Sequence, residues 1–266
     1  MHKMQIIDAH IHFFENPHFD ELALRAGHEN TEANLRESFL RNGVVRAVVM
    51  GNRDPGNYPD FCSYCVGLDS QSFDDPAEAL GQVEKHLRSP GCVGLKLYPG
   101  YNRQYVSDPL YRPFLALARD RGMPVAIHTG ATSRSSGMLK YSHPLTIDEV
   151  AAEWPDVQFV LCHFGNPWVI DAAAVVSKNP NVAADLSGIL EGAASLSDLR
   201  RDYGGYIAHL STWLEYCGRW DNLLYGTDWP LAGIPGYIEF VSHIVPEKHH
   251  DKVFFENANR VYQLGL

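Results

Sequence analysis

The chain has 266 residues, 45% of them hydrophobic, which is enough to bury the core of a barrel of about 250 residues. Its 32 acidic and 22 basic residues give a formal net charge of −10, which argues against a nucleic-acid partner. No apolar stretch approaches the roughly 20 residues that a membrane span needs. The amino terminus leads into a strand without a secretory signal, so we expect a cytoplasmic protein.

Apolar runs and helical periods alternate from the first residues onward. In chain order, strands are expected at 4–7, 44–50, 64–68, 92–97, 124–127, 157–162, 181–186 and 222–226. Helices are expected between them at 31–41, 75–87, 108–118, 146–154, 166–179 and 197–217, with a last one at 257–262. Polar residues predict several helix starts: Asp75 and Asp108 before prolines, a capping box from Thr146 to Glu149, and a cap at Asn257.

The number and character of these strands predict the fold class. Several strands lack polar alternation, which indicates burial on both faces and a parallel sheet. Eight such units in an α/β chain favour a single (β/α)₈ barrel domain over residues 1–266. A doubly wound open sheet is the alternative, but no G-x-G-x-x-G motif follows a strand, which counts against a dinucleotide site.

The five cysteines form an odd number without the spacing of a disulfide framework, so we expect reduced thiols. Cys62 and Cys65 make a lone C-x-x-C at the start of a predicted strand. We interpret them as two ordinary cysteines rather than as a redox or zinc site.

Metal-binding residue types gather at the predicted strand ends. His10 and His12 are two residues apart near the first strand, so both side chains point the same way and can reach one ion. His128, His163 and Asp228 follow later strands, and strand carboxyl ends meet on one face of a barrel. Each residue alone has an ordinary explanation in a hydrogen bond or a cap. Together they predict a shared metal site.

An ordered set of motifs then resembles a known family. The motifs are Asp8-x-His10-x-His12, Gly94-Leu95-Lys96-Leu97-Tyr98-Pro99, Pro124 to Gly130, His163-Phe164-Gly165, Tyr225 to Pro230 and Asn257 to Arg260. Through nearly the whole chain they resemble the amidohydrolase superfamily. More narrowly, they resemble its second amidohydrolase branch, which includes aminocarboxymuconate semialdehyde decarboxylase and pyrone-dicarboxylate lactonase. The resemblance implies a distorted barrel with one or two divalent ions.

Carried over residue by residue, the resemblance implies one ion, most simply zinc, bound by His10, His12, His128 and Asp228. Asp228 and His163 are then the catalytic residues. Lys96, on the strand predicted at 92–97, departs from this pattern. Binuclear relatives carry a lysine on that strand which is carboxylated and bridges two ions. In that alternative His128 and His163 bind the second ion; otherwise Lys96 is a free amine that binds an anionic substrate.

Two further comparisons refine the resemblance. Relatives often carry a second glycine where this chain has Asn166, so the resemblance does not predict the shape of that loop. TatD-like deoxyribonucleases share the H-x-H start but carry a glutamate on strand four, where this chain reads Gly94-Leu95-Lys96-Leu97.

The function predicted from these residues is hydrolysis of a small carboxylated ester, lactone or amide by metal-activated water. The alternative is non-oxidative decarboxylation of an unsaturated carboxylic acid at the same site. The expected substrate is a small anion, bound by Arg53, Tyr98, Arg103 and Arg134 from the loops after the strands. The sequence is compatible with a homo-oligomer. A metal-dependent binding protein and an inactive barrel are the remaining classes, but neither needs Asp228 and His163 together.

Overall fold

In a computed structural model the described residues are 4–14, 16–51, 58–68, 70–193 and 195–266. Within them, eight parallel strands form one sheet in which each strand pairs with the next in sequence. They are β1 (Ile6–Ile11), β2 (Val44–Met50), β3 (Cys62–Leu68), β4 (Cys92–Leu97), β5 (Val125–Ile127), β6 (Phe159–Leu161), β7 (Val182–Asp185) and β8 (Leu223–Leu224).

The sheet closes on itself through the segment that follows β8. The backbone N–H of Ala9 donates to the carbonyl of Tyr225 at 2.9 Å, and that of His12 donates to the carbonyl of Trp229 at 2.6 Å. The (β/α)₈ barrel predicted from the sequence is therefore confirmed, and the open doubly wound sheet is wrong.

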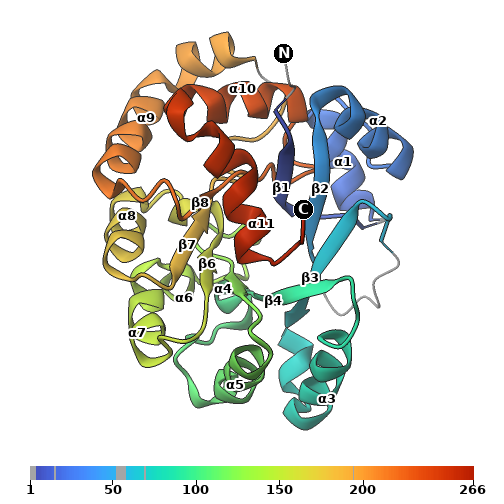
Figure 1. Ribbon diagram of the computed structural model, residues 1–266, viewed down its shortest axis with the longest axis vertical. Coiled ribbons are helices and arrows are strands. Elements are labelled where there is room, and N and C mark those ends of the chain that lie inside the picture. The colour runs from blue at the N-terminus through green and yellow to red at the C-terminus, as the bar shows by residue number, and fades with distance from the viewer. Residues whose placement is uncertain (1–3, 15, 52–57, 69, 194) are drawn as a thin grey trace.

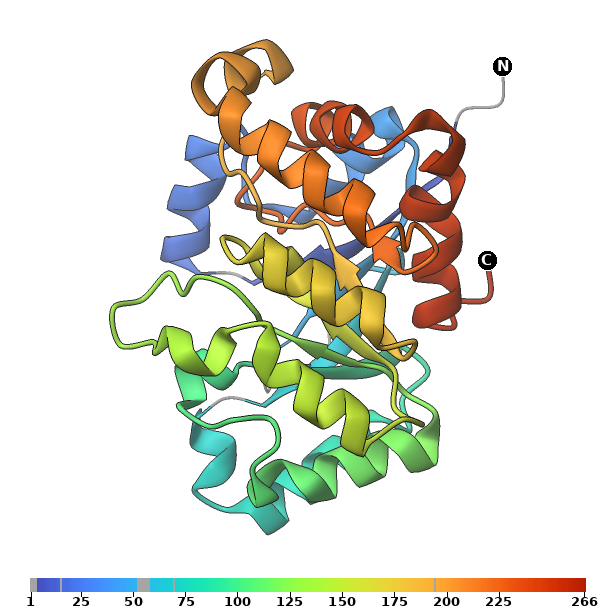
Figure 2. The same cartoon turned by 90° about the vertical axis from the view of Figure 1, so that its left-hand side faces the viewer.

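Helices surround the strands (Figures 1 and 2). The α-helices are α1 (Pro17–Arg25), α2 (Glu32–Asn42), α3 (Pro76–His86), α4 (Pro99–Asn102), α5 (Arg112–Arg121), α6 (Leu139–Ser142), α7 (Leu145–Glu153), α8 (Val169–Lys178), α9 (Leu196–Cys217), α10 (Ile234–Ile244) and α11 (Asn257–Val261). Short 3₁₀ or π segments lie at Ser70–Phe73, Pro109–Tyr111, Cys162–Gly165, Glu247–His249 and Lys252–Glu256.

Every residue of β1 and of β4 is buried, as expected for strands covered on both faces. A large apolar cluster packs the strands against the helices, and a smaller one joins strand residues to Ala258, Val261 and Tyr262 at the end of the chain. The barrel wall is therefore rigid, and it fixes the positions of side chains at the strand ends.

The helix starts predicted from the sequence are partly right. The side chain of Asp75 accepts from the N–H of Glu78 at 3.0 Å and caps α3 as predicted. The capping box is wrong, because Thr146 lies inside α7 and its hydroxyl donates to the carbonyl of His143. Asp108 accepts from the N–H of Tyr105 instead of capping a helix.

The chain end also differs from the prediction. The side-chain amide of Asn257 donates to the carbonyls of Trp220 and Leu223, so this residue ties α11 to the β8 region and does not cap it. Four helices were not predicted: α1, α10 and the four-residue helices α4 and α6.

All five cysteines are free thiols. Cys62 begins β3 and Cys65 lies within it, as expected for ordinary strand residues. Burial raises the pKa of the Cys62 thiol to about 12 and that of Cys92 to about 11, so both stay protonated and unreactive. Among the described helices, none has the length and apolar character needed to cross a bilayer.

Candidate metal centre

The centre begins at the carboxyl end of β1. His10 lies inside the strand with its ring fully buried, and His12 follows the strand with a side chain that is 16% exposed. Asp8 lies two residues earlier and accepts from the backbone N–H of Thr227 at 2.9 Å and from its hydroxyl at 2.6 Å. These bonds tie β1 to the segment after β8, which carries Asp228.

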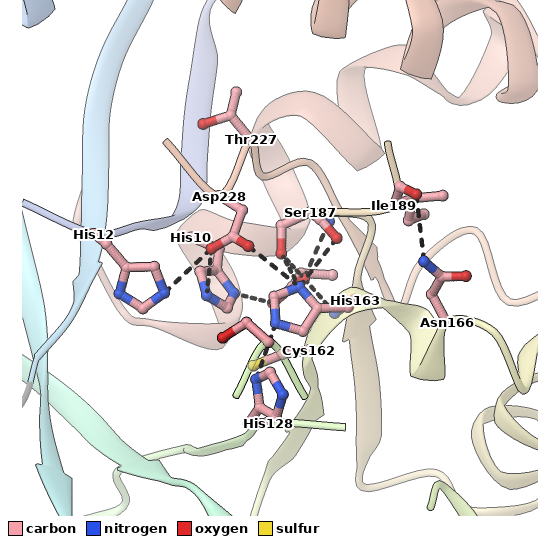
Figure 3. Close-up of polar contacts among 12 residues, drawn as sticks. His10, His12, His128, Cys162, His163, Asn166, Ser187, Ile189, Thr227 and Asp228 are labelled. Carbon is pink, nitrogen blue, oxygen red and sulfur yellow. Dashed lines mark hydrogen bonds and ion pairs between the residues drawn. The ribbon is translucent and has the colours of Figure 1, made fainter. Parts of the chain in front are cut away.

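Asp228 brings the two histidines together (Figure 3). Its Oδ1 lies 3.4 Å from Nε2 of His10 and 3.2 Å from Nε2 of His12. Asp228 has φ +63°, and its N–H donates to the carbonyl of His10 at 2.9 Å. A Cβ at Gly188 would lie 2.6 Å from Asp228 Oδ2, so only glycine leaves the carboxylate room.

The three side chains fit a divalent ion. Their ligand atoms lie within 4.8 Å of one another, and two imidazoles with a carboxylate are a common zinc donor set. Nε2 of His10 and Oδ1 of Asp228 are buried and make no well-formed hydrogen bond; Oδ1 has only the histidine nitrogens Nε2 of His10 and Nε2 of His12 beside it. Buried polar atoms are nearly always paired, so two unpaired ligand atoms side by side indicate a site for a cation.

The charges of the cluster favour a cation as well. Burial, aided by Lys96, lowers the pKa of His10 to about 3, and burial also lowers those of His128 and His163. These rings are therefore neutral at pH 7, as metal ligation requires. Burial alone would raise the pKa of Asp228, but the neighbouring His163, His12 and His10 hold it well below its usual range. The carboxylate is charged.

His128 and His163 form a second pair beside this group. Nε2 of His163 lies 3.2 Å from Nδ1 of His128. Their outer nitrogens face carbonyl oxygens, which only accept hydrogen bonds: His128 Nε2 faces Ala131 at 3.0 Å and His163 Nδ1 faces Ser187 at 3.1 Å. With both outer nitrogens protonated, the two inner nitrogens of neutral rings present lone pairs to each other. They can share a proton or bind a cation.

Of the four predicted ligands, the structure thus groups His10, His12 and Asp228 most tightly. His128 reaches that group through His163, whose ring centroid is 4.9 Å from that of His128 and 4.8 Å from that of His10. The assignment of His128 as a ligand stays a prediction, as does the catalytic role of His163.

Lys96 is fully buried in β4 beneath the same cluster. Its Nζ lies 2.7 Å from Sγ of Cys162 and 5.3 Å from the ring centroid of Tyr98. Burial raises the pKa of the Cys162 thiol, although Lys96 opposes that shift. A buried amine whose closest polar neighbour is a neutral thiol has capacity left to bind an anion.

The residues predicted to bind substrate lie in different surroundings. Tyr98 donates to the carbonyl of Met50 at 3.3 Å, and its ring lies beside His128 at 6.3 Å between centroids. Arg103 is exposed and donates to the carbonyl of Ser136 through Nε and Nη2, at 3.3 and 3.0 Å. Arg134 is exposed, and Arg53 lies outside the described residues. All four assignments stay predictions.

Two residues of the centre, Asp185 and Ser187, were not assigned a role from the sequence; they lie beside His10 and His163. The ring of Tyr101 also lies near His128, at 5.2 Å between ring centroids. Asp185 ends β7, so the rule that identified the other strand-end residues applied to it as well.

The buried Asp8 carboxyl, which accepts two hydrogen bonds from Thr227, predicts that the stability of the protein depends on pH. Burial raises the pKa of Asp8 from 3.8 to about 7, against the hydrogen bonds from Thr227. The folded protein therefore holds a proton that the unfolded chain loses above pH 3.8. The extra proton stabilises the folded state relative to the unfolded chain. Its contribution to the free energy of unfolding is complete below pH 3.8 and is lost as the pH rises through about 7.

Asp8→Asn keeps an acceptor for Thr227 but removes this titration. Between pH 5 and 8, we expect the metal-free wild type to lose about 2–4 kcal/mol of unfolding free energy relative to the variant. Urea unfolding of both proteins in the presence of a chelator measures the difference. Parallel pH profiles would contradict the prediction.

Comparison with known proteins agrees with this geometry. A family model described as amidohydrolase matches residues 70–264, so the chain belongs to the amidohydrolase family. The curated protein fluG of Emericella nidulans is 29% identical over 163 residues, which cover 58% of this chain and 18% of that protein. The chain thus matches less than a fifth of the length of that relative.

Solved structures share the fold at low identity. A probable 2-pyrone-4,6-dicarboxylic acid hydrolase from Acinetobacter baumannii, with citric acid bound, has a TM-score of 0.63 at 17% identity, covering 98% of this chain and 100% of that one. A 2,6-dihydroxybenzoate decarboxylase from Rhizobium has 0.70 at 16%, covering 99% and 100%. An amidohydrolase from Burkholderia multivorans with bound zinc has 0.70 at 17%, covering 97% and 99%.

Proposed function

We propose that the chain is a metal-dependent hydrolase of a small carboxylated ester, lactone or amide. The observation that carries this proposal is the pair of buried ligand atoms that make no well-formed hydrogen bond, Nε2 of His10 and Oδ1 of Asp228, which His12 completes. Membership of the amidohydrolase family and the zinc bound to one structural neighbour support it.

A divalent ion bound here would act as a Lewis acid and lower the pKa of water to about 7. Asp228 has a charged carboxylate with Oδ1 directed at the histidines and Oδ2 3.9 Å from Nδ1 of His163. In the proposed reaction Asp228 accepts the proton of the attacking water. His163 polarises the carbonyl under attack or protonates the leaving group.

We propose one ion, most simply zinc, held by His10, His12, His128 and Asp228. The alternative uses two ions, with His128 and His163 on the second and a carboxylated Lys96 between them. The facing inner nitrogens of His128 and His163 are compatible with this alternative. Carbon dioxide enrichment followed by intact mass measurement would detect the carbamate on Lys96.

A carboxylate on the substrate is supported by two observations. Citrate, a small carboxylated ligand, is bound in the pyrone-dicarboxylate hydrolase neighbour. Here, Lys96 offers a buried amine whose Nζ lies 5.3 Å from the ring centroid of Tyr98. Arg53, Arg103 and Arg134 are the additional candidates in the surrounding loops.

Non-oxidative decarboxylation is the second candidate, because dihydroxybenzoate decarboxylase has the same fold with a TM-score of 0.70. The same side chains serve both reactions. Asp228 or His163, once it has taken up a proton, would then donate that proton to the carbon that loses its carboxylate as carbon dioxide, instead of assisting the attack of water on a carbonyl.

Product analysis separates the two reactions. The zinc-loaded protein is incubated in ¹⁸O-labelled water with a panel of carboxylated lactones and esters and a panel of unsaturated and aromatic acids. Hydrolysis incorporates solvent oxygen into the product, whereas decarboxylation releases carbon dioxide. Carbon dioxide release without any hydrolytic product would overturn the hydrolase assignment in favour of the decarboxylase.

A further inference from the structure

We propose that Asp185 is a positioning residue that fixes which nitrogen of His10 faces the metal, and that it orients His163 through Ser187. The inference rests on the metal site proposed above and adds a residue that does not touch the metal or the substrate. Asp185 is the last residue of β7 and is fully buried. Its carboxylate links the side chain of His10 on β1 to the backbone of the segment after β6.

Three hydrogen-bond donors converge on one oxygen of this carboxylate, and the Cys162 thiol lies within 4.8 Å of the group. Oδ1 accepts from the N–H of His163 at 2.8 Å, from the N–H of Ser187 at 3.1 Å and from the Ser187 hydroxyl at 2.5 Å. Oδ2 is left for Nδ1 of His10, at 2.9 Å. Three donors converging on Oδ1 are the surroundings of a carboxylate rather than of a carboxylic acid, so Oδ2 is an acceptor as well.

The consequence for His10 is a single tautomer. A carboxylate can only accept, so Nδ1 of His10 carries the proton and donates it to Asp185. Nε2 then presents its lone pair toward Asp228, which is the arrangement that metal ligation requires. Without this acceptor, Nε2 could carry the proton and donate it to Asp228 across 3.4 Å, which would block the site.

The consequence for His163 runs through Ser187. Because the Ser187 hydroxyl donates to Asp185, its oxygen is free to accept from Nδ1 of His163 at 3.0 Å. The Ser187 carbonyl accepts from the same nitrogen at 3.1 Å. Both acceptors favour a proton on Nδ1 and leave Nε2 of His163 directed toward His128. One buried carboxylate thus orients two histidines of the centre.

Asp185→Asn tests the proposal, because asparagine keeps one oxygen but replaces the other by a donor. The oxygen is expected to stay where three donors converge, so the amide NH₂ faces Nδ1 of His10. His10 must then move its proton to Nε2. We expect zinc to bind 10–100-fold more weakly, measured by competition with a chromophoric chelator.

The control is Asp148→Asn, which alters a carboxylate on α7 that accepts from Lys178 and Asn179 away from the centre. It should bind zinc as the wild type does. An Asp185→Asn variant that is folded by circular dichroism and binds zinc as tightly as the wild type would overturn the proposal.

A second measurement does not depend on the Asp185→Asn variant. Two-bond ¹H–¹⁵N spectra of the metal-free wild type report the tautomer of each histidine, and loss of one set of peaks in His10→Gln identifies His10. We expect protonation at Nδ1, and protonation at Nε2 would overturn the proposal. A wild type that takes up no metal would refute the proposed function alone, because the tautomer is read without metal.

Discussion

Replacing Asp228 with asparagine is expected to lower kcat by about 10²–10⁴-fold and to weaken metal binding. The carboxylate serves both purposes in the proposed site. It contributes Oδ1 beside His10 and His12, and it is the charged group that accepts a proton. Asparagine has nearly the same shape but neither the charge nor the basicity. Steady-state kinetics and metal analysis of the purified variant give both numbers.

The matched control for this substitution is Asp156→Asn, which changes an exposed carboxylate to the same amide. It is expected to leave kcat and metal content unchanged. Turnover of Asp228→Asn within a few-fold of the wild type would exclude Asp228 as the proton acceptor.

Replacing His163 with asparagine is expected to retain the metal and to lose most of the turnover, by about 10²–10⁴-fold in kcat. His163 lies beside Asp228 and His128, but in the one-ion site it is not a ligand. Metal content by atomic emission and kcat are measured on the same preparation.

His209→Asn, an exposed histidine on α9, controls for the substitution itself. If His163→Asn lost metal in proportion to activity, the two-ion site would replace the one-ion site. Unchanged turnover with full metal content would remove His163 from the mechanism.

The barrel could be predicted from sequence because its strands are short apolar runs that are buried on both faces. β2 and β4 have the predicted bounds, 44–50 and 92–97. α1 (Pro17–Arg25) was missed although Asn16 caps it and a proline lies in its first turn, because Ala23 is its one buried residue and the helix has no large apolar face. The capping box at Thr146 failed because α7 begins at Leu145, two residues earlier than the motif requires. A local motif does not show at which residue a helix begins, because the surrounding packing decides this.

The site could be predicted where strand ends carry metal-binding residues. His10 and His12 from β1 and its end come together with Asp228 from the segment after β8, although Asp228 is more than 200 positions away from both histidines in the chain. Asp185 ends a strand in the same way, but an aspartate there has many ordinary uses. Its role follows from four hydrogen bonds to residues 2, 22 and 175 positions away, which no local pattern specifies.

The metal content of the purified protein tests the central claim most directly. After supplementation with zinc and removal of loosely bound ions, mass spectrometry should return one zinc per chain. A chelator should remove both the zinc and the activity, and added zinc should restore both. A His10→Ala, His12→Ala double variant should return close to none. Well under one metal per wild-type chain after supplementation would contradict the proposed metal centre.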